Sequence, residues 1–203
     1  MSRAAFHAVN PRFAHLPEYV EACQKQDRLR DFAFLELEAV LCGHVVKPMT
    51  ARHLALLTHC GNGFVTGGDV LPEHIPQFIY VLKGGSLADE KAMRRFAVDF
   101  GWRNFKTCCD EIEAFVNATF LDSPEGGGKR GETFNSWLAS LVDVLAREYG
   151  WQQREVLDLP IACVFQYLRV IRMRSSDKEP MVNKLSDEAR AKGIARMMAE
   201  AKN

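Results

Sequence analysis

A glycine-rich stretch is the first place where this sequence could hold a ligand. Residues 53–72 read HLALLTHCGNGFVTGGDVLP, so an apolar helical pattern runs into four glycines within eight positions. A Walker loop needs GxxxxGK followed by Ser or Thr, with the lysine reaching the phosphates, and a dinucleotide-binding loop follows a strand. Here Asp69 stands where a positive charge is needed, and a helical pattern precedes the glycines. We therefore expect the glycines to take positive φ angles at a helix end and turn, without binding a nucleotide.

Histidine and cysteine side chains do not form a recognisable catalytic or metal site. His53 and His59 are six residues apart and would point to different faces of a helix, and the chain has no CxxC or HExxH motif. Cys108 and Cys109 lie beside Lys106, a cation that can lower a thiol pKa, but the sequence supplies no base or oxyanion donor for them. The sequence predicts no catalytic residue, no metal ligand and no cofactor, and a protein that is not an enzyme.

Three arginines provide an alternative binding chemistry. Arg169, Arg172 and Arg174 crowd the end of a predicted helix in RVIRMRSSDK. The helix dipole favours cations at this end in any protein, and the sequence lacks an aromatic RNA-binding motif or a basic recognition helix. Lys plus Arg equals Asp plus Glu, at 26 each, so no net field draws the chain to nucleic acid or to an anionic membrane. A small nucleic-acid-binding regulator using these arginines remains an alternative hypothesis.

The elements that must position these side chains are predicted to be helices. Apolar residues recur at three and four positions through most of the chain, beginning with RLRDFAFLELEAVLC at residues 28–42. The other helices are expected from a Thr50 cap to Gly61, from Pro72 to Gly84, from a capping box at Ser86 and Asp89 to residue 102, over 104–121, from a Thr133 cap to Gly150, from Pro160 to residue 174, and beyond Ser186.

Strand signals are confined to two very short segments. Residues 45–46 and 64–66 are the candidates, and segments of this length form a sheet only if they pair with each other as a small ribbon. The predicted fold class is therefore all-α, mainly a helical bundle, with one tiny β-ribbon near residues 45–46 and 64–66.

One stretch divides the chain by composition. DSPEGGGKRG, from residue 122, combines proline, four glycines and mixed charges with no apolar side chain, and its GGGKRG is not a Walker loop because no strand precedes it and no Ser or Thr follows the lysine. We predict an N-terminal helical domain at 1–121, a flexible linker at 122–132, a C-terminal helical unit at 133–175, and a tail at 176–203 that is mobile or ordered by a partner.

Three segments of the sequence resemble proteins encoded among the tail genes of long-tailed bacteriophages and prophages. They read FLELEAVLCGHVVKPMTARHLALLTHCGNGFVTGG, DVLPEHIPQFIYVL and EYGWQQREVLDLPIACVFQYLR, and together they cover about a third of the chain. The functional class that they resemble is the tail assembly chaperone. GNGF at residues 61–64 departs from the commoner SPF pattern of such sequences.

This resemblance implies a helical protein that coats the hydrophobic tape measure protein, recruits tail tube subunits and leaves before the tail is complete. It implies no catalytic residue. The chain has no apolar run of the roughly 20 residues that span a membrane and no long apolar run at its N-terminus, so we expect it in the host bacterial cytoplasm. A structural virion component, such as a head-tail joining or baseplate protein, is the competing hypothesis, and the oligomeric state stays open, a homo-oligomer included.

A chaperone for an amphipathic helix needs an apolar surface between its own helices. Two groups of large apolar residues are the candidates, one around the glycine-rich turn and one in the C-terminal unit. They are Phe64, Val65, Phe78, Ile79 and Leu82 in the first group, and Trp137, Trp151 and Phe165 in the second. For each of these residues, burial in the core is the competing interpretation.

Overall fold

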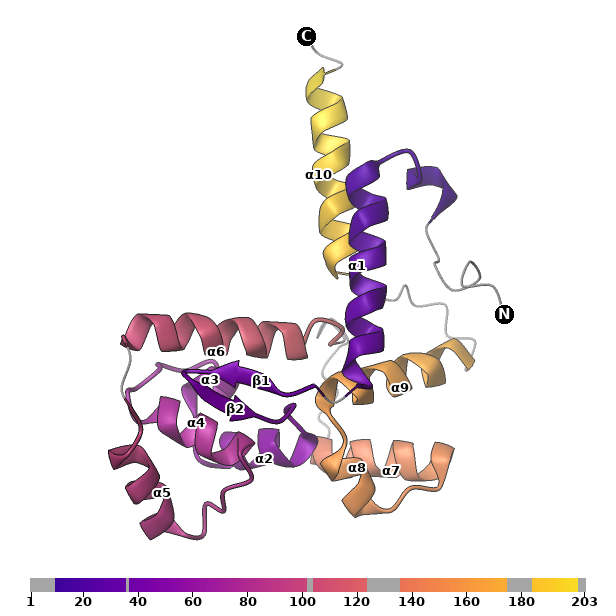
Figure 1. Ribbon diagram of the computed structural model, residues 1–203. Helices are drawn as coiled ribbons and strands as arrows, with labels where there is room; N and C mark the ends of the chain where they lie inside the picture. Colours follow the sequence, from indigo (N-terminus) through magenta and orange to yellow (C-terminus); the bar gives the residue numbers. More distant parts are fainter. Residues whose placement is uncertain (1–9, 36, 102–103, 124–135, 175–183, 201–203) are drawn as a thin grey trace.

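The computed structural model describes residues 10–35, 37–101, 104–123, 136–174 and 184–200, and these residues form ten α-helices and one β-hairpin (Figure 1). The predicted class, mainly all-α with a tiny β-ribbon, is confirmed. The elements are η2 (Pro11–Phe13), α1 (Pro17–Ala33), β1 (Ala39–Leu41), β2 (His44–Val46), α2 (Ala51–His59), α3 (Gly63–Thr66), α4 (His74–Leu82), α5 (Glu90–Val98), α6 (Phe105–Thr119), α7 (Trp137–Tyr149), α8 (Gln153–Asp158), α9 (Ile161–Arg174) and α10 (Lys184–Glu200). Among the described helices, none is both long and apolar enough to cross a membrane.

The first core lies where α2, α3, α5 and α6 and the hairpin meet around α4. Helix α4 is the most deeply buried element, since six of its nine residues are buried. Phe78 stands at the centre, edge-on to Phe64 of α3 at 5.7 Å and to Phe115 of α6 at 6.3 Å between ring centroids. Edge-to-face aromatic pairs of this kind stabilise a core beyond the area they bury.

The second core joins α7, α8 and α9 to the N-terminal end of α2. Ala51, at the start of α2, is fully buried in it with Leu145 and Ile161. The backbone N–H of Ile161 donates to the carbonyl of Met49 at 2.8 Å, and Leu54 and Phe120 pack against both cores. The two cores are therefore continuous across α2.

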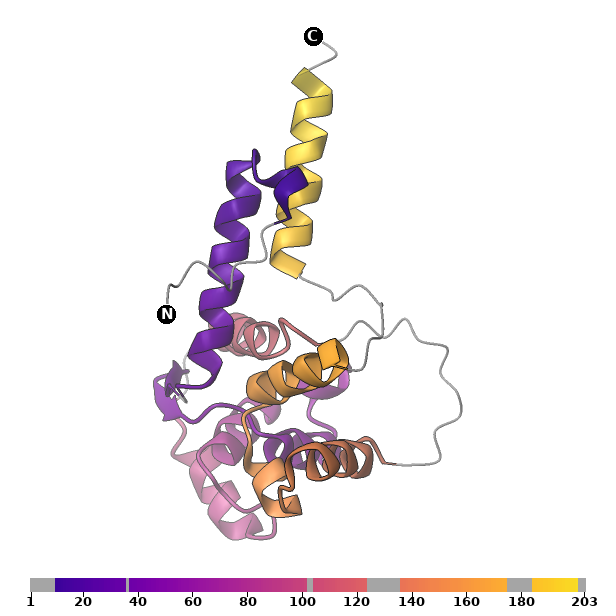
Figure 2. The same cartoon turned by 90° about the vertical axis from the view of Figure 1, so that its right-hand side faces the viewer.

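Helices α1 and α10 project from the two cores as a pair, which we call the arm (Figures 1 and 2). They run antiparallel, because Ser186 lies beside Gln26 at one end while Arg196 pairs with Glu18 at the other. Gly193 allows close approach, since a Cβ at this position would lie 3.2 Å from a methyl carbon of Leu16. A terminal helix is therefore present, beginning at Lys184, and it packs against α1 of its own chain.

The prediction of a helix over residues 28–42 is correct up to Ala33 and wrong beyond it. The helix ends there, and Ala39–Leu41 pair antiparallel with His44–Val46 around a two-residue turn. Cys42 and Gly43 form this turn with φ angles of 51° and 83°. Positive φ angles at both positions suit a tight hairpin turn. A cysteine rarely indicates such a turn, and the short apolar run before it fits the periodicity of a helix as well as that of a strand.

The predicted ribbon is half correct. Residues 45–46 do lie in a strand, but their partner is β1, and residues 64–66 belong to helix α3. Asn62 caps α3 by accepting the N–H of Phe64, and Gly67 ends it with a φ of 73°. The Asn62 cap and the glycine at the end therefore favour a helical turn in this segment, although its β-branched residues indicated a strand.

Several predicted helix starts shift by a few residues. Helix α4 begins at His74 instead of Pro72, Asp89 alone caps α5, and α7 begins after Ser136 instead of Thr133. Thr50 and Gly150 act as predicted, at the start of α2 and the end of α7. Residues 124–132 of the predicted linker and residues 176–183 and 201–203 of the predicted tail lie outside the described residues.

Candidate functional site

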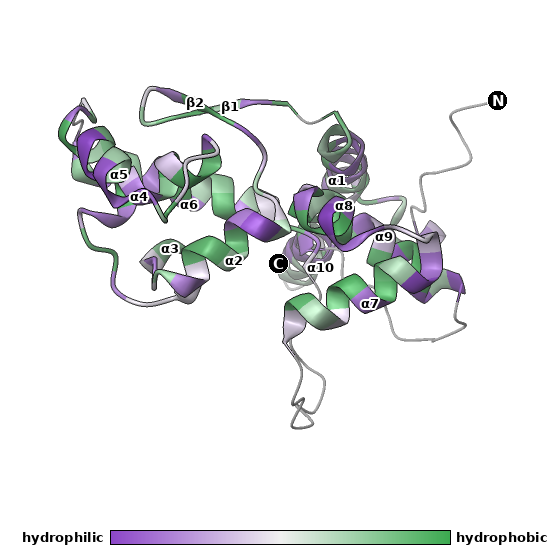
Figure 3. Ribbon diagram, turned by 90° about the horizontal axis from the view of Figure 1, so that it is seen from below, coloured by the Kyte–Doolittle hydropathy of each residue, from purple (hydrophilic) through white to green (hydrophobic). Residues whose placement is uncertain are grey.

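An apolar groove runs between α7 and α9 and is the best candidate for a binding site. Its volume is about 390 Å³. Figure 3 shows α7 and α9 from below, with green hydrophobic stretches on α7. Helix α7 contributes Trp137, Ser140, Leu141 and Val144, helix α9 contributes Ile161, Val164, Phe165 and Leu168, and Leu54, Phe120 and Ser123 complete the lining.

The spacing of these residues explains why a groove forms here. Positions 137, 141 and 144 recur along one stripe of α7, and 161, 164, 165 and 168 do the same on α9. Leu145 of α7 and Ile161 of α9 belong to the same buried cluster and hold the two helices together. Trp137 stays 46% exposed at one end of the groove. A large exposed indole beside an apolar channel is typical of protein-binding surfaces.

Of the three binding residues predicted in the C-terminal unit, the structure brings Trp137 and Phe165 together and places Trp151 elsewhere. Trp137 and Phe165 both line the groove, as part of a continuous apolar surface. Trp151 lies elsewhere, stacked on Tyr149 at 4.8 Å and edge-on to Tyr167 at 4.8 Å between ring centroids. Trp151 therefore packs within an aromatic cluster and does not line the groove.

The predicted binding residues around the glycine-rich turn are part of the first core. Phe78, Ile79 and Leu82 are 0% exposed, and Phe64 and Val65 pack half-buried against them. Fully buried side chains are unavailable to a partner unless the core opens. The competing interpretation, burial in the core, therefore applies to Phe78, Ile79 and Leu82.

The glycine-rich turn is a structural joint between α2, α3 and α4. The buried Asn62 amide donates to the carbonyl of His74 at 2.9 Å and to Oε1 of Gln77 at 2.8 Å. Nδ1 of His74 accepts the N–H groups of Gly63 and Leu71, each at 3.1 Å. A Cβ at Gly63 would lie 2.5 Å from the carbonyl oxygen of Asp69, so only glycine fits there. The N–H groups of Gly63 and Leu71 are thus occupied by His74 of the chain itself.

The three arginines of the nucleic-acid hypothesis do not form one free basic surface. Nη1 of Arg169 lies 4.0 Å from Oδ1 of Asp122, and the Arg169 side chain is only 21% exposed. Arg174 lies over the ring of Tyr149, with 6.0 Å from its guanidinium carbon to the ring centroid. Arg172 is exposed. Sequence proximity at a helix end therefore does not align these cations for phosphate binding.

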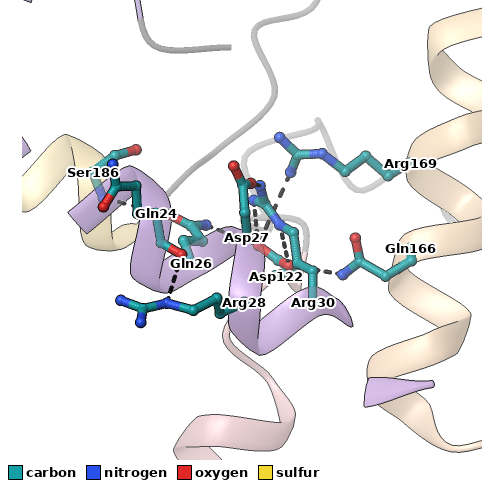
Figure 4. A network of polar contacts seen from close by, with 9 residues as sticks. All are labelled: Gln24, Gln26, Asp27, Arg28, Arg30, Asp122, Gln166, Arg169 and Ser186. Atoms are coloured by element: carbon teal, nitrogen blue, oxygen red, sulfur yellow. Dashed lines mark hydrogen bonds and ion pairs between the residues drawn. The ribbon is translucent and has the colours of Figure 1, made fainter. Parts of the chain in front are cut away.

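A buried carboxylate, Asp122, joins the arm to the second core (Figure 4). Its oxygens accept bidentate hydrogen bonds from Arg30 of α1, from Nε at 2.7 Å and Nη2 at 2.8 Å. Gln26 of α1 donates to it at 3.0 Å, and Gln166 of α9 donates at 2.8 Å. The Asp122 side chain is only 6% exposed. We refer to these four residues, with Arg169, as the Asp122 cluster.

The electrostatics of the Asp122 cluster favour the ionised acid. Burial alone would raise the pKa of Asp122, but the hydrogen bond and charge of Arg30, with the amides of Gln166 and Gln26, outweigh burial and hold the pKa below its ordinary value. Sequence reasoning missed this residue because it opens the stretch DSPEGGGKRG and so was assigned to the linker. Its partners lie 92, 96 and 44 positions away along the chain.

Chemical groups that would indicate catalysis or metal binding are not clustered in the part of the chain that the structure describes. No group of three or more His, Cys, Asp or Glu side chains there could hold a metal ion. The groove itself offers only the hydroxyls of Ser123 and Ser140 beside its apolar lining. Comparisons with protein-family models, with curated proteins and with solved structures find no match.

Proposed function

We propose that this protein is a non-enzymatic assembly chaperone of phage tails that binds apolar helical segments of the tape measure protein in the α7–α9 groove. The observation that carries the proposal is the groove itself, an apolar channel with an exposed Trp137 at one end. The apolar stripe of an amphipathic helix is the natural complement of a channel between two helices. The protein acts in the host bacterial cytoplasm and recruits tail tube subunits to the coated tape measure.

Two lines of reasoning support this proposal over the alternatives. The sequence segments that resemble tail assembly chaperones include residues 148–169, which contain most of α9 and its contribution to the groove. The arginines that motivated nucleic-acid binding are engaged in part by Asp122 and Tyr149, which disfavours a DNA-binding regulator.

A binding titration tests the proposal. Overlapping fragments covering the tape measure protein of the same gene cluster are titrated into the full chain, with tryptophan fluorescence of the chain and fragment anisotropy as readouts. At least one fragment should bind, and Val144→Glu, which places a charge in the groove, should weaken binding at least about tenfold. Val170→Glu is the matched control, because Val170 lies on α9 with 37% exposure and does not line the groove.

The outcomes separate the hypotheses. Equal weakening by both glutamate substitutions would place the binding surface elsewhere. Failure of every fragment to bind the wild-type chain would refute the chaperone function. Mass spectrometry of purified virions adds a second check, since a chaperone should be absent from the particle, and a fixed copy number would support a structural virion component instead.

A further inference from the structure

The Asp122 cluster and the groove share the same backbone segments. On α9, Phe165 and Leu168 face the groove, while their neighbours Gln166 and Arg169 contact Asp122. After α6, Phe120 and Ser123 line the groove on either side of Asp122 in sequence. The residues that line the groove are therefore only one or two positions in sequence from Asp122 or from the residues that contact it. A bound helix that moves either segment also moves the carboxylate or its partners.

The other side of the cluster belongs to the arm. Arg30 and Gln26 of α1 hold the carboxylate, and Oε1 of Gln26 accepts the N–H of Ser186 at the start of α10 at 3.4 Å. Nζ of Lys184 also lies 3.4 Å from Oγ of Ser123. Helix α10 packs mainly along α1, so the position of the arm depends on how α1 meets α9 and Asp122.

We propose that Asp122 couples the groove to the arm, so that a helix bound between α7 and α9 loosens the attachment of α1 and α10. This inference rests on the proposed function of the groove. In the free protein, hydrogen bonds from both α1 and α9 meet at one buried carboxylate. A helix seated against Phe165 and Leu168 displaces α9 relative to α1, and this displacement lengthens the hydrogen bond from Gln166 or those from Arg30.

Thermodynamic linkage fixes the reciprocal effect. If occupancy of the groove weakens the contacts of the arm, then weakening those contacts must strengthen binding in the groove by the same factor. The two states are an arm held by Asp122 with an empty groove, and an occupied groove with a loosened arm. Coupling of this kind commonly changes affinity by about 5-fold to 150-fold.

Hydrogen exchange and affinity measurements on the full chain test the coupling. The probe is the tape measure fragment that binds most tightly in the titration above. Binding should accelerate amide exchange in α1 and α10, and Asp122→Asn should bind the fragment about fivefold more tightly, with a smaller change in exchange on binding. Gln26→Leu keeps both charges and removes contacts of the arm, so it should shift the affinity in the same direction and covers the case in which Asp122→Asn fails to fold.

Asp158→Asn is the matched control. Asp158 also pairs with two arginines, Arg52 at 2.7 Å and Arg154 at 3.7 Å, but its side chain is 47% exposed and its partners lie outside the arm. This substitution should leave both affinity and arm exchange unchanged. Binding to the wild type without any change in α1 and α10 would overturn the coupling while leaving the chaperone function intact. Unchanged affinity in both Asp122→Asn and Gln26→Leu would also overturn it, whereas absence of binding to the wild type would refute the proposed function first.

Discussion

Single buried polar residues decide how the helices of this protein meet. Asn62 is fully buried, and its amide nitrogen and oxygen bond to backbone and side chain around the glycine-rich turn. Asp122 is nearly buried and joins α1 to α9. At both places packing alone leaves the relative orientation of the helices adjustable, and the directional hydrogen bonds select one arrangement.

Replacing Asn62 tests this role at the glycine-rich turn. Asn62→Ala should lower the free energy of unfolding by about 1–3 kcal/mol, because the carbonyl of His74 and the side chain of Gln77 lose a donor inside the protein. Urea denaturation followed by circular dichroism measures the change. Asn117→Ala, on the exposed face of α6, is the control and should change stability by less than about 0.5 kcal/mol. A similar small effect at Asn62 would show that the turn is held by its glycines alone.

At the scale of elements, the periodicity of apolar residues predicts most of the helices, but it does not predict what covers the apolar face of each helix. The stripe on α7 and α9 predicted an apolar surface, and Trp137 and Phe165 do line the groove. The stripe on α4 looked equivalent, yet Phe78, Ile79 and Leu82 are enclosed in the first core. A one-dimensional pattern shows that one face of a helix is apolar, but what covers that face depends on segments distant in sequence.

Turn chemistry and composition misled the sequence prediction for a related reason. The hairpin depends on a positive φ angle at Cys42, which no cysteine signature announces. The composition of its neighbours assigns Asp122 to the glycine-rich linker, although its hydrogen-bond partners are far away along the chain. The error at Asp122 concerns a residue whose role is set by long-range contacts, and the error at Cys42 concerns a backbone conformation that the residue type does not signal.

Helix α2 carries a pH-sensitive cap that can be tested directly. Nδ1 of His53 accepts the N–H of Thr50 at 3.3 Å, while Oγ1 of Thr50 accepts the N–H of His53 at 3.2 Å. Burial lowers the pKa of His53 below its ordinary value, so the neutral ring is favoured in the folded state. Its contribution to stability is therefore present above about pH 6.5 and is lost as the pH falls through the lowered value.

His53→Gln should remove this pH dependence, because glutamine is a common acceptor at the third helical position and does not titrate. At pH 8 the variant should match the wild type within about 0.5 kcal/mol, and at pH 5 it should be the more stable of the two. Thermal melts at the two pH values measure the difference. His59→Gln, at an exposed position of the same helix, is the control for the substitution itself and should change the free energy of unfolding at pH 8 by less than about 0.5 kcal/mol. The same slope in His53→Gln and the wild type would assign the titration to another group.

The whole molecule combines a pair of packed cores with an arm that buries little. Helix α4 buries six of nine residues, whereas α1 and α10 each bury two of seventeen. The stability of a helix in a protein comes mainly from the apolar surface that it packs against neighbours. The arm therefore has the weakest support among the long helices, and its attachment depends on the Asp122 cluster and on Phe34, which lies edge-on to Tyr167 of α9 at 5.7 Å.

Amide hydrogen exchange of the free protein should resolve this difference. Local opening has a lower free energy where few buried contacts must be broken, so α10 and the N-terminal half of α1 should exchange much faster than α4. Mass spectrometry of peptides from the three helices gives the comparison, and the C-terminal half of α1, held by Arg30 and Gln26, should be intermediate. Equal protection across α1, α10 and α4 would mean that the arm unfolds only with the cores, and that a partner in the groove would have to destabilise the entire molecule to move it.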